Sequence, residues 1–187
     1  MTKLKTLYAL GFLAILTTPS SVFAKENASA SWTESYVDVG SGLGMEWNFH
    51  TVDGQPILEF GVKETSHRLD RLWEFTCANL DAGQGTISNT IFAKSPEVRK
   101  GDEFGFSIRV DDGRSFGLVG HKGLFQIQGV SSHYPQFDIS DSHNLWDEMR
   151  RGKRAFVNMN GNKFSIHLNG SSHAIQNFLN ACSEGVG

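Results

Sequence analysis

The sequence predicts a mainly β protein, either an antiparallel β-sandwich or an open barrel, with two short helices, the C-terminal one packed on the sheet. Three observations predict this fold class. Apolar and polar residues alternate in many short segments, as they do in strands that bury one face. Twenty glycines and fourteen phenylalanines in 187 residues favour strands joined by tight turns. Only two segments space their apolar residues as a helix does.

The N-terminus has the three-part pattern of a secretory signal peptide. Lys3 and Lys5 precede an apolar run of about ten residues, Leu7 to Leu16, and Val22-Phe23-Ala24 ends in a cleavage signal. The run is shorter than the roughly 20 residues that a transmembrane helix needs. We therefore expect residues 1–24 to be removed on export.

The mature chain is then expected to hold one domain. Residues 25–31 are small and polar and predict a flexible leader, and residues 32–187 predict a single β-rich domain. No later segment is long and apolar enough to span a bilayer. These features predict a periplasmic or secreted protein.

The charge balance argues against a nucleic-acid partner. The signal peptide holds two lysines and no acid, so its removal changes the formal net charge from −3 to −5. Phosphate binding needs a basic surface. The basic cluster Arg150, Arg151, Lys153 and Arg154 follows a predicted helix, where positive charge is favourable. We expect the partner to be a protein or another component of the envelope.

Alternation and turn signals place the strands. Asp111-Asp112-Gly113-Arg114 and Asn160-Gly161 each predict a hairpin turn. Gly40 to Gly44 predicts a flexible turn, because the segment that follows has a strand pattern, whereas a phosphate-binding loop leads into a helix. Residues 131–143 are expected to form a loop. The predicted strands are 45–50, 58–62, 73–77, 87–93, 104–110, 116–118, 124–130, 157–159 and 164–168.

Two helices are expected in the last third of the chain. The first runs near Asn144 to Arg151, with possible caps at Asp141, Ser142 and Asn144 and a stop at Gly152. The second runs near Ser172 to Cys182, with Ser171 or Ser172 as its cap. Its apolar residues repeat at three and four positions, so it should bury one face in the core.

The only two cysteines, Cys77 and Cys182, are expected to form a disulfide. An exported protein meets an oxidising compartment, in which disulfides persist. Both cysteines lie on faces predicted to point into the core, Cys77 on a strand and Cys182 on the last helix. In the chain-entropy model, such a bond would stabilise the fold by roughly 4–5 kcal/mol. Two buried free thiols are the alternative.

The predicted 131–143 loop holds the candidate site residues. His133, Asp138, Asp141 and His143 carry imidazole and carboxylate groups, which bind zinc and related ions, although their spacing matches no closed metal site. Tyr134 and Phe137 are aromatic residues that either pack under the loop or meet a partner. The two outcomes stay open for this pair.

The last third of the chain resembles a known pattern. Phe164-Ser165-Ile166-His167-Leu168 leads into Asn169-Gly170-Ser171-Ser172 and then into Phe178-Leu179-Asn180-Ala181-Cys182. This order of strand, capped turn and apolar helix resembles the C-terminal end of small uncharacterised exported proteins of Gram-negative bacteria. It is also similar to the invasion-associated locus B family. That resemblance implies export and a link to host-cell entry, and it supplies no catalytic residues.

The sequence favours a non-catalytic function. It lacks a G-x-S-x-G elbow, an H-E-x-x-H motif and a P-loop, and no cofactor is expected. We expect an exported domain that binds or inhibits a partner in or beyond the cell envelope. Two alternatives remain: a metal-dependent hydrolase that uses residues 133–143, and a secreted virulence factor that acts on host cells.

Overall fold

The computed structural model describes residues 36–62, 71–78, 85–92, 99–127 and 130–184. Within these ranges the chain forms ten strands and two helices. The helices are α1 (Leu145–Arg151) and α2 (Ser171–Glu184). The strands are β1 (Val37–Asp38), β2 (Met45–Val52), β3 (Gln55–Val62), β4 (Arg71–Ala78), β5 (Thr86–Ile91), β6 (Glu103–Val110), β7 (Ser115–Ile127), β8 (Val130–Ser140), β9 (Arg154–Met159) and β10 (Asn162–His167).

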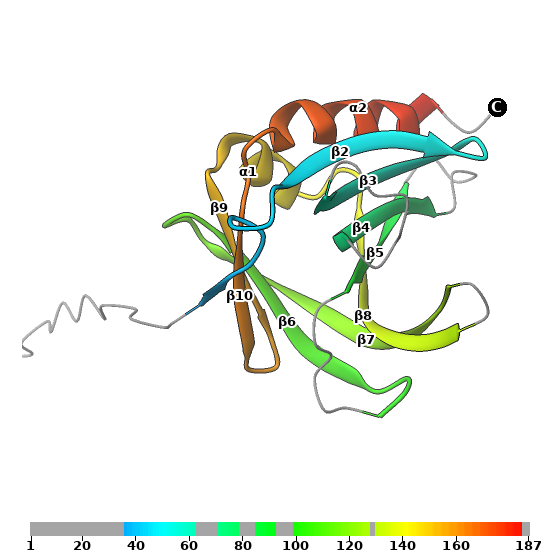
Figure 1. The fold of residues 1–187 in the computed structure, drawn as a ribbon, viewed down its shortest axis with the longest axis vertical. Helices are drawn as coiled ribbons and strands as arrows, with labels where there is room; N and C mark the ends of the chain where they lie inside the picture. Colours follow the sequence, from blue (N-terminus) through cyan, green and yellow to red (C-terminus); the bar gives the residue numbers. More distant parts are fainter. Residues whose placement is uncertain (1–35, 63–70, 79–84, 93–98, 128–129, 185–187) are drawn as a thin grey trace, which may run out of the picture. The chain divides into compact units, whose positions relative to one another are not determined.

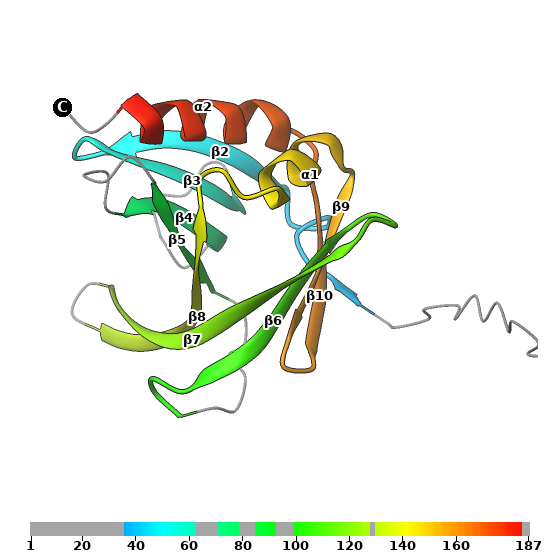
Figure 2. The ribbon, with the colours of Figure 1, turned by 180° about the vertical axis from the view of Figure 1, so that it is seen from behind.

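All ten strands belong to one sheet, in the order β1-β10-β9-β6-β7-β8-β5-β4-β3-β2. Among the described strands, β1 pairs with β10 in parallel, and all other neighbours in this order pair antiparallel. The sheet curls into a half-barrel, with both helices at one end of it (Figures 1 and 2). The mainly β prediction is therefore confirmed, and the fold takes the open-barrel form.

The two faces of the curled sheet have different chemistry. The inner face, on which the helices pack, carries large apolar side chains at alternate positions of each strand. One row of directly paired inner residues runs from Trp47 through Phe60 and Trp73 to Ile91, and all four are buried. Burying one such side chain stabilises the fold by about 1.5–3 kcal/mol. The intervening positions form the outer face.

The helices cover the inner face with their apolar stripes. In α1, the ring of Trp146 lies 5.4 Å from the ring of Phe75 and 6.3 Å from that of Phe178 on α2. Ser171 begins α2, and its hydroxyl donates a 2.7 Å hydrogen bond to the carbonyl of Met149 in α1. The sequence suggested Ser171 or Ser172 as the cap of α2. In the structure, the Ser171 hydroxyl joins the two helices.

Three elements differ from the sequence-based expectation. The predicted strands at 116–118 and 124–130 merge largely into the single strand β7. The short strand β1 was not predicted. Residues 130–140 form β8, so the expectation of a loop at 131–143 is wrong for most of that segment. Pro135 weakens the sequence signal for this strand, because proline removes an amide donor. Pro135 pairs with Lys122 on β7, and pairing with β5 begins only at Gln136.

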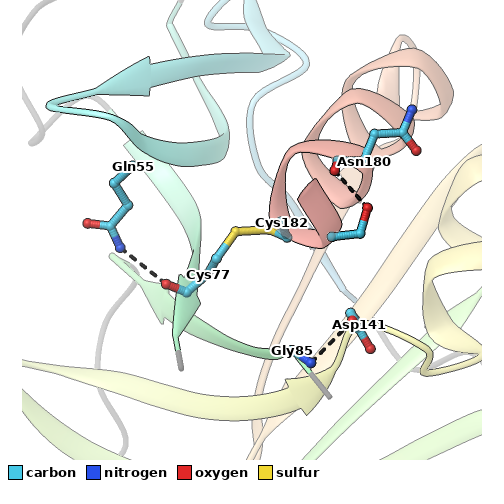
Figure 3. Close-up of a disulfide and its surroundings, with 7 residues drawn as sticks. Gln55, Cys77, Gly85, Asp141, Asn180 and Cys182 are labelled. Carbon is cyan, nitrogen blue, oxygen red and sulfur yellow. Dashed lines mark hydrogen bonds between the residues drawn. A yellow bond between two sulfur atoms is a disulfide. The ribbon is translucent and has the colours of Figure 1, made fainter. Parts of the chain in front are cut away.

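A disulfide joins α2 to the sheet. Cys77 on β4 and Cys182 in the last turn of α2 are bonded, with their Cα atoms 5.8 Å apart (Figure 3). Both are buried, at 7% and 4% exposure. The side-chain amide of Gln55 also donates to the carbonyl of Cys77, which fixes the β2–β3 turn beside the bond.

Neither helix in the described residues has both the length and the apolar character needed to cross a bilayer.

Loss of the disulfide should strongly destabilise the domain. We expect Cys182→Ser to lower the free energy of unfolding by about 4–5 kcal/mol, because the bond closes a loop between residues 105 positions apart. Urea denaturation with and without reductant measures this effect, since reductant should bring the wild type to the stability of the variant. Ser183→Ala, at an exposed neighbour, should change stability by less than about 0.5 kcal/mol. Equal stability of Cys182→Ser and wild type would contradict the prediction.

Candidate functional site

Within the described residues, the strands position three polar features on the outer face of the sheet that bear on function. The first is an ionic cluster on β2, β3 and β4. The second is a hollow between β6 and β9, and the third is a hollow between β5 and β8. Outer faces of antiparallel sheets are commonly polar because they meet water. A feature on this face is therefore informative only where its polar groups are buried or hold a defined shape.

The ionic cluster is built on two glutamates that face each other. Glu59 on β3 lies directly opposite Glu74 on β4, and both are buried, at 8% and 4% exposure. Like charges in this arrangement repel. Arg71 offsets the repulsion: its Nη1 lies 2.8 Å from Glu74 Oε2, and its Nε contacts Glu59. One guanidinium therefore binds both carboxylates.

His50 on β2 borders this cluster. Its Nδ1 lies 3.9 Å from Glu59 Oε1. Burial lowers the pKa of His50, the charge of Arg71 lowers it further, and Glu74 partly opposes them. The cluster ties three neighbouring strands together, and its carboxylates are engaged within the chain.

The β6–β9 hollow is an open depression of about 380 Å³ on the outer face. Asn160 and Gly161 form the β9–β10 turn with φ angles of +48° and +93°, as the Asn-Gly signal predicted. The side-chain oxygen of Asn158 accepts a 2.9 Å hydrogen bond from the Gly161 amide, and the Asn160 amide donates to the carbonyl of Gly105. These bonds fix the rim. The lining residues are Gly105, Phe106, Ser107, Asn158, Asn160 and Gly161.

An aromatic stack borders the β6–β9 hollow. Phe156 lies two positions from Asn158 on β9 and directly opposite Arg109 on β6. The guanidinium of Arg109 lies 4.5 Å from the Phe156 ring centroid, and Tyr36 packs edge-on against the same ring at 5.1 Å. Such cation–π and aromatic contacts contribute about 0.5–1.5 kcal/mol each. The stack therefore stiffens this part of the outer face.

The β5–β8 hollow is smaller, about 290 Å³, and contains a carboxylate. Its lining residues are Gly85, Thr86, Asp138, Ile139 and Ser140. The Ser88 hydroxyl donates a 2.7 Å hydrogen bond to Asp138. Beside the hollow, Asp141 Oδ2 accepts a hydrogen bond from the Gly85 amide at 3.2 Å (Figure 3). Both aspartates thus take part in joining β8 to β5.

The four predicted metal ligands are not brought together. Asp138 lines the β5–β8 hollow, whereas Asp141 beside it accepts a hydrogen bond from the Gly85 amide, and α1 has no side-chain cap. His143 accepts a hydrogen bond from the Leu145 amide through Nδ1, and its ring packs on Phe116. His133 lies opposite Leu124, an odd number of residues from Asp138 and so on the other face of the strand. In the part of the chain that the structure describes, no three His, Cys, Asp or Glu side chains gather in a metal-binding group.

The two predicted binding aromatics have different environments. Phe137 is fully buried on the inner face, 4.5 Å from the ring of Phe106 and 6.2 Å from that of Trp73. Of the two outcomes left open for Phe137, the structure shows packing in the core, because β8 turns the side chain inward. Tyr134 is half-buried and packs edge-on against Phe92 at 5.0 Å. A binding role for Tyr134 stays a prediction.

Sequence reasoning missed the residues of the β6–β9 hollow. The sequence did hold a local signal, because Ser107 separates the apolar Phe106 and Ile108 of a predicted strand and must therefore face outward. Asn158 similarly separates Val157 and Met159. The pairing of Ser107 with Asn158 could not be read from alternation, because it depends on β6 lying beside β9.

A comparison of the chain with protein-family models, with curated proteins and with solved structures finds no match.

Removing the charge of Arg71 from the ionic cluster should destabilise the fold. We expect Arg71→Met to lower the free energy of unfolding by about 3–5 kcal/mol, since it leaves two buried carboxylates facing each other. Urea denaturation measures the loss. Adding Glu59→Gln and Glu74→Gln to the same chain should recover most of it, because neutral amides do not repel. A stable Arg71→Met single variant would contradict this account of the cluster.

Two histidines should make stability fall on mild acidification. Burial lowers the pKa of His50 and of His143 below the ordinary value of 6.5, with help from Arg71 and Arg114 respectively. As pH falls below about 6.5, the unfolded chain therefore binds more protons than the folded chain. The contribution of these two histidines to the free energy of unfolding is fully present above about pH 6.5 and is lost as pH falls toward their folded-state pKa values.

Urea denaturation between about pH 7.5 and about pH 5 measures this loss. The double variant His50→Gln/His143→Gln should flatten the dependence, whereas His173→Gln, at an exposed site on α2, should leave it unchanged. Asp38, whose pKa Arg154 lowers below 3.8, acts below this window. Stability that rises on acidification would contradict the assignment.

Proposed function

We propose that this protein is an exported, non-catalytic domain that binds a partner in or beyond the cell envelope through the β6–β9 hollow. The N-terminal sequence pattern supports export, and the disulfide between Cys77 and Cys182 is compatible with an oxidising compartment. The hollow on the outer face between β6 and β9 supports the choice of binding site. The partner is a protein or another envelope component.

One observation carries the proposal: the hollow keeps polar groups that the fold leaves unused. The side-chain oxygen of Asn158 accepts a hydrogen bond from the Gly161 amide. Within the described part of the chain, no hydrogen bond engages the Asn158 amide nitrogen or the Ser107 hydroxyl. The chain therefore presents a donor and a hydroxyl in an open depression. Polar groups placed in this way are what a ligand site uses for orientation.

The strands below the hollow make a rigid platform. β6 pairs with β7 on one side and with β9 on the other, so its backbone is held along most of its length. Directly across from Ser107 on β7 lies Gly117, which has no side chain to obstruct an approaching partner. A site on paired strands holds its groups in place before binding, which lowers the entropic cost of association.

Filling the hollow should abolish partner binding. We expect Ser107→Trp to place an indole over Asn158 and to reduce recovery of the partner from envelope extract at least about tenfold. The readout is a pull-down with the mature protein as bait. Thr51→Trp is the control, because it adds the same side chain at an exposed position on β2.

Both variants should have the circular dichroism spectrum and thermal midpoint of the wild type to within a few degrees. Full recovery of the partner by Ser107→Trp would refute the assignment of the site. Equal loss in Ser107→Trp and Thr51→Trp would also refute it, because the effect would then not depend on the hollow.

A further inference from the structure

We infer that the β6–β9 hollow binds a neutral saccharide chain. This inference rests on the proposed function and names the ligand class of that same site. It follows from three properties of the hollow: the absence of charge in its lining, the arrangement of its donors and acceptors, and its size and openness.

The lining is uncharged and consists of five small or polar residues together with Phe106. Its hydrogen-bonding side chains are one hydroxyl and two carboxamides, from Ser107, Asn158 and Asn160, and none of the lining residues ionises. A charged ligand would find no counter-ion there, and an apolar ligand would cover amides without giving them a partner. Leaving a polar group unpaired costs about 1–3 kcal/mol. A ligand rich in neutral hydroxyls avoids both penalties.

Sugar hydroxyls match the groups on offer. A hydroxyl both donates and accepts, a carboxamide offers two donors and an acceptor, and a serine offers one hydroxyl. Ser107 and Asn158 are directly paired across β6 and β9, so their side chains stand side by side on one face. Two adjacent hydroxyls of one sugar ring are spaced to reach two such neighbouring groups.

The hollow is preorganised and accessible. The bond from the Gly161 amide fixes the orientation of the Asn158 carboxamide, so its nitrogen has a defined direction before a ligand arrives. Chain neighbours aside, no atom lies within 4 Å of the position that a Cβ would take at Gly105 or Gly161, so a ring can approach the backbone closely there. These features lower the cost of ordering the site.

Size and openness favour a chain over an enclosed small molecule. The volume of about 380 Å³ lies at the small end of the range of about 300–1,000 Å³ for ligand sites. The hollow opens to solvent on the outer face, so neighbouring sugar units can continue beyond the unit that is bound. We therefore place one sugar unit of a longer chain in the hollow.

The main alternative ligand class is an anionic glycan, because two cations flank the hollow. Lys163 lies directly opposite Asn158 on β10, and Arg109 follows Ser107 on the same face of β6. Arg109 is held over Phe156 and also bonds the carbonyl of Asp111. Neither cation lines the hollow itself. A comparison of neutral with anionic oligosaccharides therefore tests the inference directly.

The test uses Asn158→Asp in the mature full-length domain. Aspartate keeps an oxygen for the Gly161 amide, so the turn is preserved, but it replaces the free amide donor with a second oxygen. We expect neutral oligosaccharides of the cellulose, chitin and dextran series to include a ligand for the wild type. Asn158→Asp should weaken its binding about 5–10-fold, as for one lost hydrogen bond. Isothermal titration calorimetry gives the affinities, and Gln176→Glu on α2 is the matched amide-to-acid control.

The possible outcomes test the ligand class and the location of the site separately. Neutral binding that falls in Asn158→Asp at an unchanged thermal midpoint supports the inference, because a purely structural Asn158 would leave affinity unchanged. Binding of anionic oligosaccharides alone, such as alginate fragments, overturns it. If no oligosaccharide binds while Ser107→Trp still loses the envelope partner, the saccharide inference fails and the proposed function stands. If Ser107→Trp has no effect either, both fail.

Discussion

The closure of the curled sheet over its aromatic inner face is the constraint on which the structure depends. A sheet with one apolar face is stable only when that face is covered. Here the curl brings β2 and β10, which lie near opposite ends of the sheet, close enough to bond. The indole of Trp47 on β2 donates a 3.0 Å hydrogen bond to the carbonyl of His167 on β10. Phe60 packs edge-on against the ring of His167 at the same place.

The contacts of Trp47 and Phe60 with His167 form a seam, and this seam explains why the chain needs glycine before β2. Gly40 has a φ of +99° and is buried against Phe60, where a Cβ would lie 2.9 Å from the ring. Only glycine satisfies both the backbone angle and the space. At the other end of the inner face, the disulfide holds the last turn of α2 on β4. The helices, the seam and the disulfide therefore seal one face together, and the other face is left for polar side chains.

Local pattern predicted the parts of this fold that depend on neighbouring residues. The Asn160-Gly161 hairpin, both helices and the inward direction of Cys77 and Cys182 follow from spacing over a few positions. Strand order does not, because alternation tells which face a residue occupies and says nothing of which strand lies beside it. Phe137 shows the limit: its place in the core depends on β8 pairing with both β5 and β7, which a proline at position 135 concealed.

The outer face holds two kinds of polar group, and the sequence does not distinguish them because strand order cannot be read from alternation. Glu59 and Arg71 carry opposite charges, and they bind each other. Charges that are buried in this way stabilise an arrangement only when each is compensated within the chain. Ser107 and Asn158 are unremarkable in the sequence, and they keep hydrogen-bonding capacity because the turn at Gly161 uses only one end of the carboxamide. In a sheet sealed on its inner side, polar groups that keep hydrogen-bonding capacity lie on the outer face, and Ser107 and Asn158 are two of them.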